Sequence, residues 1–150
     1  MKVYLGSDHR GFKIKEKIKV WLLEHDYEVL DQGAHTLDEN DDYTTFAGRV
    51  ASSVALNRNS MGILACGSGV GVDVMANKFD GARSSIGKEP EQVEAGRRDD
   101  DMNILVIAAD YTSDGEAIEM VEKFLETEFA ENTERYQRRL RDIARVEENN

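Results

Sequence analysis

Cys66 is the residue whose surroundings point most directly to chemistry. It ends an apolar run and is followed at once by the glycine-rich turn Gly67–Gly71. Backbone N–H groups in such a turn, with the start of a following helix, create a positive potential that favours a thiolate and stabilises a neighbouring oxyanion. Most lone cysteines are small buried apolar residues. The position of Cys66 before a glycine turn favours the reactive interpretation.

The turn itself does not have the spacing of a nucleotide-binding motif. It follows the third predicted strand instead of the first, its pattern is G-x-G-x-G, and the Gly-Lys-Ser/Thr of a P-loop is absent. It is therefore either a plain strand-to-helix turn or a cradle for a small anion or enolate, and the cradle fits better than a nucleotide site.

A second polar cluster follows the first predicted strand, where Asp8, His9 and Arg10 are consecutive. An Asp–His pair at the end of a strand can hold hydroxyl groups and move protons. An alternative interpretation has about equal weight: Ser7 or Asp8 caps the following helix, and the two basic residues are solvated. The remaining histidines are expected at the surface: His25 and His35.

Five arginines gather near the end of a strongly acidic chain: Arg135, Arg138, Arg139, Arg141 and Arg145. Arg135 and Arg139 share a helix face, and two guanidiniums suit bidentate contact with a phosphate. Without other information, the simpler interpretation is a solvated face paired with acidic neighbours: Glu131, Glu134 and Asp142. The adjacent face is predicted to be buried through its apolar residues: Tyr136, Leu140 and Ile143.

These residues are positioned by short apolar runs that alternate with helical patterns along the whole chain. The predicted strands are Lys2–Gly6, Glu28–Leu30, Gly62–Cys66, Ala82–Ile86 and Ile104–Ala108. The predicted helices are Phe12–His25, Tyr43–Leu56, Val72–Lys78, Glu89–Arg98, one around Ala117–Leu125 and one through Tyr136 to Ile143. The alternation predicts an α/β fold, a three-layer α/β/α Rossmann-like sandwich with a five-stranded parallel sheet and a C-terminal helix. Ligands bind beyond the carboxyl ends of such strands.

Three further segments are expected to lie in solvent. The first predicted helix carries lysines that are most simply solvated: Lys13, Lys15, Lys17 and Lys19. The polar stretch Gln32–Asp42 is predicted to be a loop, and the tail Glu147–Asn150 is predicted to fray.

Composition limits the classes of protein that the chain can represent. With 150 residues, 40% of them hydrophobic, residues 1–150 are expected to form a single domain with a sizeable core. A net charge of −11 repels phosphodiester backbones and disfavours nucleic-acid binding. No apolar run reaches the ~20 residues of a membrane span and no signal peptide opens the chain, so a cytoplasmic location is expected. A single cysteine excludes an intrachain disulfide and a multi-cysteine zinc site.

Together these segments resemble the ribose-5-phosphate isomerase B family, which includes galactose-6-phosphate isomerase subunits. The resemblance covers nearly the whole chain. It rests on Gly6–Phe12, Asp42-Tyr43, Cys66–Gly71, Ala76–Lys78, Gly81–Arg83, Asn103–Leu105, and Arg135 with Arg139.

The resemblance implies aldose–ketose isomerisation of a sugar phosphate through a cis-enediolate, without a metal or organic cofactor. Cys66 would be the base, and backbone N–H groups would stabilise the enediolate, from Gly67, Ser68, Gly69, Val70 and Gly71. Ser68 stands where many members have Thr, and Val72 stands where members without the cysteine carry a catalytic Glu. Sugar hydroxyls would be bound by Asp8 and His9, and the phosphate by Arg135 and Arg139, with His9 a further candidate. A homodimer or homotetramer with shared active sites is implied.

One departure from the family pattern bears on the substrate. Asp99 occupies the position of the histidine credited with opening the furanose ring, and Asp100 that of an asparagine that steadies the enediolate. The substrate is therefore either ribose 5-phosphate or an open-chain tetrose phosphate. Two alternatives to a homo-oligomeric isomerase stay open: a non-catalytic sugar-phosphate sensor, and one subunit of a hetero-oligomeric isomerase.

Overall fold

The computed structural model describes all 150 residues and contains one parallel sheet. Its strands are β1 (Lys2–Ser7), β2 (Glu28–Asp31), β3 (Ser60–Cys66), β4 (Ser84–Ile86) and β5 (Ile104–Ala108). They lie in the order β2-β1-β3-β5-β4, and every neighbouring pair is parallel. The helices are α1 (Phe12–Glu24), α2 (Tyr43–Leu56), α3 (Val70–Ala76), α4 (Pro90–Asp100), α5 (Asp114–Glu126) and α6 (Glu134–Glu148).

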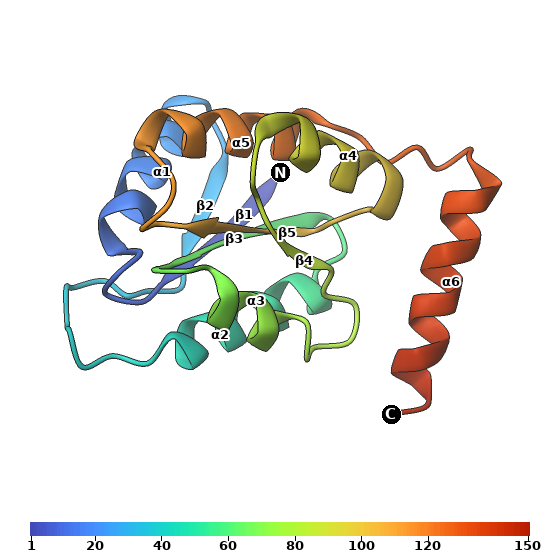
Figure 1. Ribbon diagram of the computed structural model, residues 1–150, viewed down its shortest axis with the longest axis horizontal. Helices are drawn as coiled ribbons and strands as arrows, with labels where there is room; N and C mark the ends of the chain where they lie inside the picture. Colours follow the sequence, from blue (N-terminus) through green and yellow to red (C-terminus); the bar gives the residue numbers. More distant parts are fainter.

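Helices cover both faces of the sheet (Figure 1). Because successive strand residues point to opposite faces, each central strand contributes to two cores. Ile63 and Ala65 of β3 pack with residues of α1, α4 and α5, whereas Leu64 and Cys66 pack with residues of α2 and α3. The predicted three-layer α/β/α sandwich with five parallel strands is confirmed, and the side chain of Cys66 lies on the α2/α3 side.

Two helices differ from their predicted bounds in ways that affect the site. α3 begins at Val70, two residues earlier than expected, because the glycine turn is completed by Gly69 in a left-handed conformation (φ 78°). α4 continues to Asp100 instead of ending at Arg98, so Asp99 and Asp100 lie in its last helical turn. The C-terminal tail also differs from the prediction that Glu147–Asn150 frays. α6 extends to Glu148, and only the final two residues follow it.

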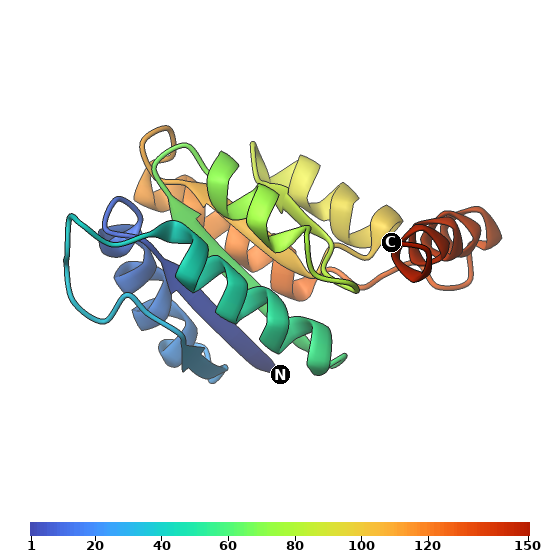
Figure 2. The same ribbon diagram turned by 90° about the horizontal axis from the view of Figure 1, so that it is seen from below.

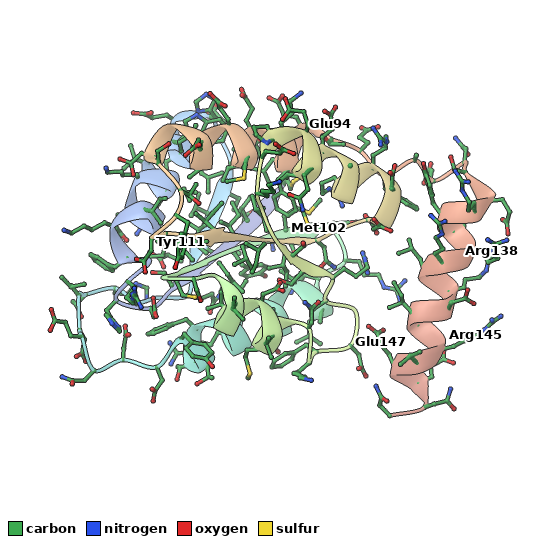
Figure 3. The ribbon with its side chains drawn as sticks, viewed as in Figure 1. Glu94, Met102, Tyr111, Arg138, Arg145 and Glu147 are labelled. Carbon is green, nitrogen blue, oxygen red and sulfur yellow. The ribbon has the colours of Figure 1, made fainter.

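α6 projects from the sandwich at the end remote from the β1–α1 turn (Figures 1 and 2). None of its residues is buried, so the predicted burial of Tyr136, Leu140 and Ile143 does not occur within the single chain. Contacts near both ends hold its direction. Asp99 lies beside Tyr136, and Glu147 accepts a hydrogen bond of 3.0 Å from the Gly81 N–H. Figure 3 shows Glu147 pointing toward the sandwich and Arg138 and Arg145 pointing away from it.

Lys15 was predicted to be solvated, and the structure shows that it is buried. Its side chain is 1% exposed and donates hydrogen bonds to both carboxylate oxygens of Asp31 and to the Ala34 carbonyl. Lys19 also contacts Asp31, at 2.8 Å. A buried ammonium is stable only when its donors are satisfied. The contact between Lys15 and Asp31 meets this need and connects α1 to the end of β2.

Candidate functional site

The carboxyl ends of β1 and β3 bring the first group of predicted residues together. The strand register pairs Ser7 with Ala65, which places Asp8 and Cys66 side by side at the next position. The register of β3 with β5 pairs Cys66 with Ala108, so Cys66 lies on a central strand between two neighbours. Its side chain is buried, with 5% exposed. We call Asp8, His9, Cys66 and the turn Gly67–Gly71 the strand-end group.

The glycine turn is shaped by close contacts with neighbouring side chains. A side chain at Gly71 would meet the Tyr43 ring at 2.7 Å, and one at Gly67 would meet Arg10 Nε at 2.6 Å. Gly69 adopts a left-handed backbone that glycine favours. The Val70 N–H donates to Ser68 Oγ at 3.3 Å, and the N–H groups of the first turn of a helix have no partner within it. The turn therefore presents donors beside Cys66, as a cradle for a small anion requires.

Arg10 covers the outer side of this turn. Its guanidinium forms an ion pair with Asp110, which follows β5, and the pair lies against Gly67. The exposed Tyr111 lies at the same strand ends (Figure 3). The interaction between Arg10 and Asp110 connects the turn after β1 to the turn after β5, so Arg10 is not simply solvated.

The two carboxylate oxygens of Asp8 differ, because one is hydrogen-bonded within the chain and the other is free. Oδ1 accepts hydrogen bonds of 3.0 Å from the N–H groups of Arg10 and Gly11. Gly11, and neither Ser7 nor Asp8, is the N-cap residue of α1. Oδ2 makes no hydrogen bond within the chain and is available to accept one from a substrate hydroxyl. Asp8 therefore orders the turn and still presents an acceptor next to Cys66.

His9 contacts a carboxylate that sequence reasoning left in a polar loop. Its Nδ1 lies 2.7 Å from Asp41 Oδ1, and its N–H donates to the same oxygen at 3.0 Å. This hydrogen bond raises the pKa of His9 above 6.5; partial burial opposes the shift, and the charges of Asp8 and Glu39 add to it. No pattern in the sequence pairs residues 32 positions apart, so this contact could not have been predicted.

Asp8, His9 and Asp41 are also the one group of side chains with the composition of a cation site. Their ligand atoms lie within 4.8 Å of one another. The hydrogen bond between His9 and Asp41 occupies one potential ligand atom of each residue. The arrangement is therefore that of a hydrogen-bonded Asp–His pair beside a second carboxylate.

The remaining predicted residues form a second group on α4 and α6, which we call the helix group: Asp99, Asp100, Arg135 and Arg139. Asp99 accepts hydrogen bonds of 2.7 and 3.1 Å from the guanidinium of Arg98. These bonds lower the pKa of Asp99 below 3.8 despite partial burial, and Tyr136 and the charge of Arg135 add to the effect. Asp99 is thus a weaker base than an unperturbed aspartate. It also lines a groove of about 340 Å³ between α4 and β4, together with Asp100.

The arginines of α6 differ in their partners. Arg141 pairs with Glu134 at 2.6 Å and Arg145 with Asp142 at 3.0 Å, as the solvated-face interpretation predicts. Arg135 and Arg139 are exposed and form no ion pair. Arg138 is likewise exposed without an ion pair, and it points away from the sandwich in Figure 3. The guanidiniums of Arg135, Arg138 and Arg139 are therefore all available for an anion from outside the helix.

The two groups do not meet within one chain. Figures 1 and 2 place the carboxyl ends of β1 and β3 at one end of the long axis and α6 at the other. A cleft of about 480 Å³ lies between Glu147 of α6 and Val54 of α2, and it contains none of the predicted site residues. Within one chain, the strand-end group and the helix group are therefore separate.

Fold and site together define a parallel α/β protein with a buried free cysteine beside a glycine-rich turn at the strand ends. The sequence pattern of the Ribose/Galactose Isomerase family matches residues 3–143. A probable ribose-5-phosphate isomerase B from Mycoplasma genitalium is 36% identical over 146 residues, covering 97% of this chain and 95% of the relative. Ribose-5-phosphate isomerase B from Escherichia coli is 34% identical, covering 98% and 97%.

A solved structure agrees with these relatives. Ribose-5-phosphate isomerase B from Mycoplasma genitalium with bound ribulose 5-phosphate superposes with a TM-score of 0.94 at 35% identity, covering 99% of this chain and 97% of that one. The chain belongs to the ribose/galactose isomerase family, and the resemblance seen in the sequence is confirmed. None of its helices combines the length and the apolar character that crossing a membrane requires.

Proposed function

We propose that the protein is an aldose–ketose isomerase of a phosphorylated sugar, with Cys66 as the base in a cis-enediolate mechanism. The observation that carries the proposal is the position of Cys66 at the end of β3, between Asp8 and the turn Gly67–Gly71. A base, a hydroxyl acceptor and a row of N–H donors are what proton transfer between adjacent carbons needs. None of these steps calls for a metal or an organic cofactor.

In the forward direction the Cys66 thiolate takes the proton from C2 of the open-chain aldose. The C–H electron pair forms the C1–C2 double bond, and the carbonyl electrons move to O1 as an enediolate. N–H groups of Gly67–Gly71 stabilise that charge, and Asp8 Oδ2 holds a substrate hydroxyl. Ser68, which is exposed in the glycine turn, would move the proton from O2 to O1. Return of the first proton from Cys66 to C1 gives the ketose.

The phosphate would be held by a second copy of the chain. Arg135 and Arg139 lie on α6, whose apolar face is open, with Ile143 43% and Val146 62% exposed. An exposed apolar stripe on a projecting helix favours association with another protein surface. In a symmetric dimer each strand-end group would receive the helix group of the other copy. This supports a homodimer, or a tetramer built from it, with shared active sites.

Two substrates are consistent with the site. The relatives are named for ribose 5-phosphate, which closes into a furanose that must be opened before isomerisation. Asp99 stands where the family has its ring-opening histidine, and its lowered pKa makes it a poor base near neutrality. This favours a sugar that needs no ring opening, such as a tetrose 4-phosphate. Asp100 would add a second negative charge near the enediolate, which disfavours the isomerisation of either sugar and does not discriminate between them.

The test is a panel of four- to six-carbon aldose and ketose phosphates in D₂O with EDTA. We expect product formation with deuterium incorporated at the carbon adjacent to the carbonyl. A sensor would bind a sugar phosphate without exchange of its C–H protons. A subunit of a hetero-oligomer would become active only with its copurifying partner. Binding without turnover or exchange in the isolated homo-oligomer would refute the proposal.

A further inference from the structure

Asp41 is a largely buried carboxylate whose two oxygens have different environments. The loop between β2 and α2 brings it to the turn after β1, where its side chain is 9% exposed. Oδ1 accepts from both the N–H and Nδ1 of His9, whereas Oδ2 is buried and has no hydrogen-bond partner. A buried carboxylate with an unsatisfied oxygen is costly unless a cation compensates its charge.

His9 is the only group positioned to supply that compensation. No lysine or arginine forms an ion pair with Asp41. The carboxylates that face His9 are Asp8 before it and Asp41 and Glu39 in the loop, and all of them favour the imidazolium. With Nδ1 engaged by Asp41, Nε2 makes no hydrogen bond within the chain, and the ring is 27% exposed.

We propose that Asp41 is a positioning residue that holds His9 as an imidazolium and directs its Nε2–H toward an anionic oxygen of the substrate phosphate. The inference rests on the proposed function and assigns a role to a residue outside the predicted site. Asp41 fixes which ring nitrogen is free, because the hydrogen bond at one nitrogen determines the role of the other. His9 would then oppose Arg135 and Arg139 across the phosphate.

The first test measures the protonation of His9 directly and does not depend on turnover. The Cε1–H resonance of His9, assigned with His9→Gln, is titrated by NMR in the wild type, Asp41→Asn and Asp42→Asn. Asn keeps an oxygen acceptor for both His9 contacts but removes the charge. We expect a His9 pKa above 6.5 in the wild type, a lower one in Asp41→Asn, and no change in Asp42→Asn, whose exposed side chain makes no capping hydrogen bond.

The second test separates a charge effect from a loop-folding effect. Asp41→Asn should raise KM for the sugar phosphate about five- to tenfold with little change in kcat, the difference between a charge-assisted and a neutral hydrogen bond. The loss should be largest between the His9 pKa values of the variant and the wild type, where only the wild type carries an imidazolium. It should shrink below both values, where His9 is charged in both proteins, and above both, where it is neutral in both. In a His9→Ala background Asp41→Asn should have no further effect on KM.

Several outcomes would overturn the proposal. A wild-type His9 pKa at or below 6.5 would do so whether or not any variant folds. So would an unchanged pKa in Asp41→Asn, or equal losses from Asp41→Asn in the presence and absence of His9. If no sugar phosphate is turned over, the proposed function fails. The shift of the His9 resonance on adding inorganic phosphate, at pH values on either side of its pKa, still decides whether the pair binds a phosphate anion.

Discussion

The strand-end group and the helix group are built in opposite ways. Cys66 and Asp8 are buried at the ends of central strands, and the sheet register fixes their separation. Arg135 and Arg139 are exposed on a helix that buries no residue of its own. Proton transfer needs atoms placed to within a fraction of an ångström, which a packed core provides. Charge attraction to a phosphate tolerates more freedom, so it can be supplied from a surface helix of another copy.

The largest expected effect comes from removing the base. Cys66→Ala should reduce turnover by about 10²–10⁴-fold, because the proton acceptor is lost while Asp8, His9 and the arginines remain. Binding of a sugar phosphate, measured by calorimetry, should be nearly unchanged. Cys66→Ser, with a hydroxyl of much higher pKa, serves as the isosteric control and should be almost as inactive. Near-normal turnover in either variant would remove Cys66 from the mechanism.

A mixing experiment tests whether the two groups act across copies. Cys66→Ala lacks the base, and the double variant Arg135→Ala/Arg139→Ala lacks the phosphate contacts, so each alone should be nearly inactive. Co-refolded in equal amounts, half of the dimers would carry one intact site, and activity should return to about a quarter of wild type. If both groups served the same chain, no mixed dimer would contain a complete site and no activity would return.

The support of the strand-end group can be broken without touching it. Lys15→Met removes the buried ammonium that holds Asp31, and should lower the free energy of unfolding by about 3–5 kcal/mol. Burial alone would raise the pKa of Asp31, but the bonds from Lys19, Lys15 and the Gly33 N–H keep it lowered.

A group with a lowered pKa stabilises the fold above its unfolded value, so the difference between Lys15→Met and wild type should shrink below about pH 4. Urea unfolding at pH 7 and at pH 3.5 measures it. Lys13→Met, an exposed position on the same helix without an ion pair, is the matched control. Equal destabilisation by the two substitutions would exclude a special role for the buried ammonium.

On the helix group, single arginine substitutions should act on binding. Arg135→Ala or Arg139→Ala should raise KM about 10- to 100-fold, because a charge-assisted bond to phosphate is worth about 1.5–3 kcal/mol. Arg141→Ala and Arg145→Ala should have little effect, since these residues already pair with Glu134 and Asp142. Equal effects at all four positions would indicate a loss of helix stability instead of a loss of phosphate contacts.

The sequence predicted what local periodicity determines and missed what distant contacts determine. Hydrophobic alternation and helical spacing gave the layers, because they record which face of an element is buried. Lys15 looked solvated because its partner Asp31 lies on another element, and nothing in the spacing reveals a buried ion pair. Asp41 was missed for the same reason.

The environment of α6 shows a different limit. Its apolar residues were predicted to be buried, and within the single chain they are not. Amphipathic periodicity reports that a face is apolar and says nothing of which molecule it contacts. The extension of α4 to Asp100 was also unforeseen, because the run of acidic residues at its end favours a turn or loop by composition.

The smallest expected effect tests how far the helix group determines the substrate. Asp99 is a carboxylate held by Arg98, with a pKa lowered below 3.8, so at neutral pH it is a weak acceptor for an anomeric hydroxyl proton. A histidine at this position would have a pKa near 6.5 and would be half-ionised near neutrality. Asp99→His with Asp100→Asn should therefore raise kcat/KM for ribose 5-phosphate about three- to tenfold. The same change should leave kcat/KM for an acyclic tetrose phosphate unchanged or lower it, because that substrate has no ring to open.

Arg98 loses its partner in this variant, so Asp99→Asn with Asp100→Asn controls for the freed guanidinium and should not improve the ribose reaction. If the wild type already isomerises ribose 5-phosphate faster than any tetrose phosphate, ring opening does not limit the reaction. The open-chain hypothesis then fails, and the protein is a pentose phosphate isomerase with a substituted ring-opening group.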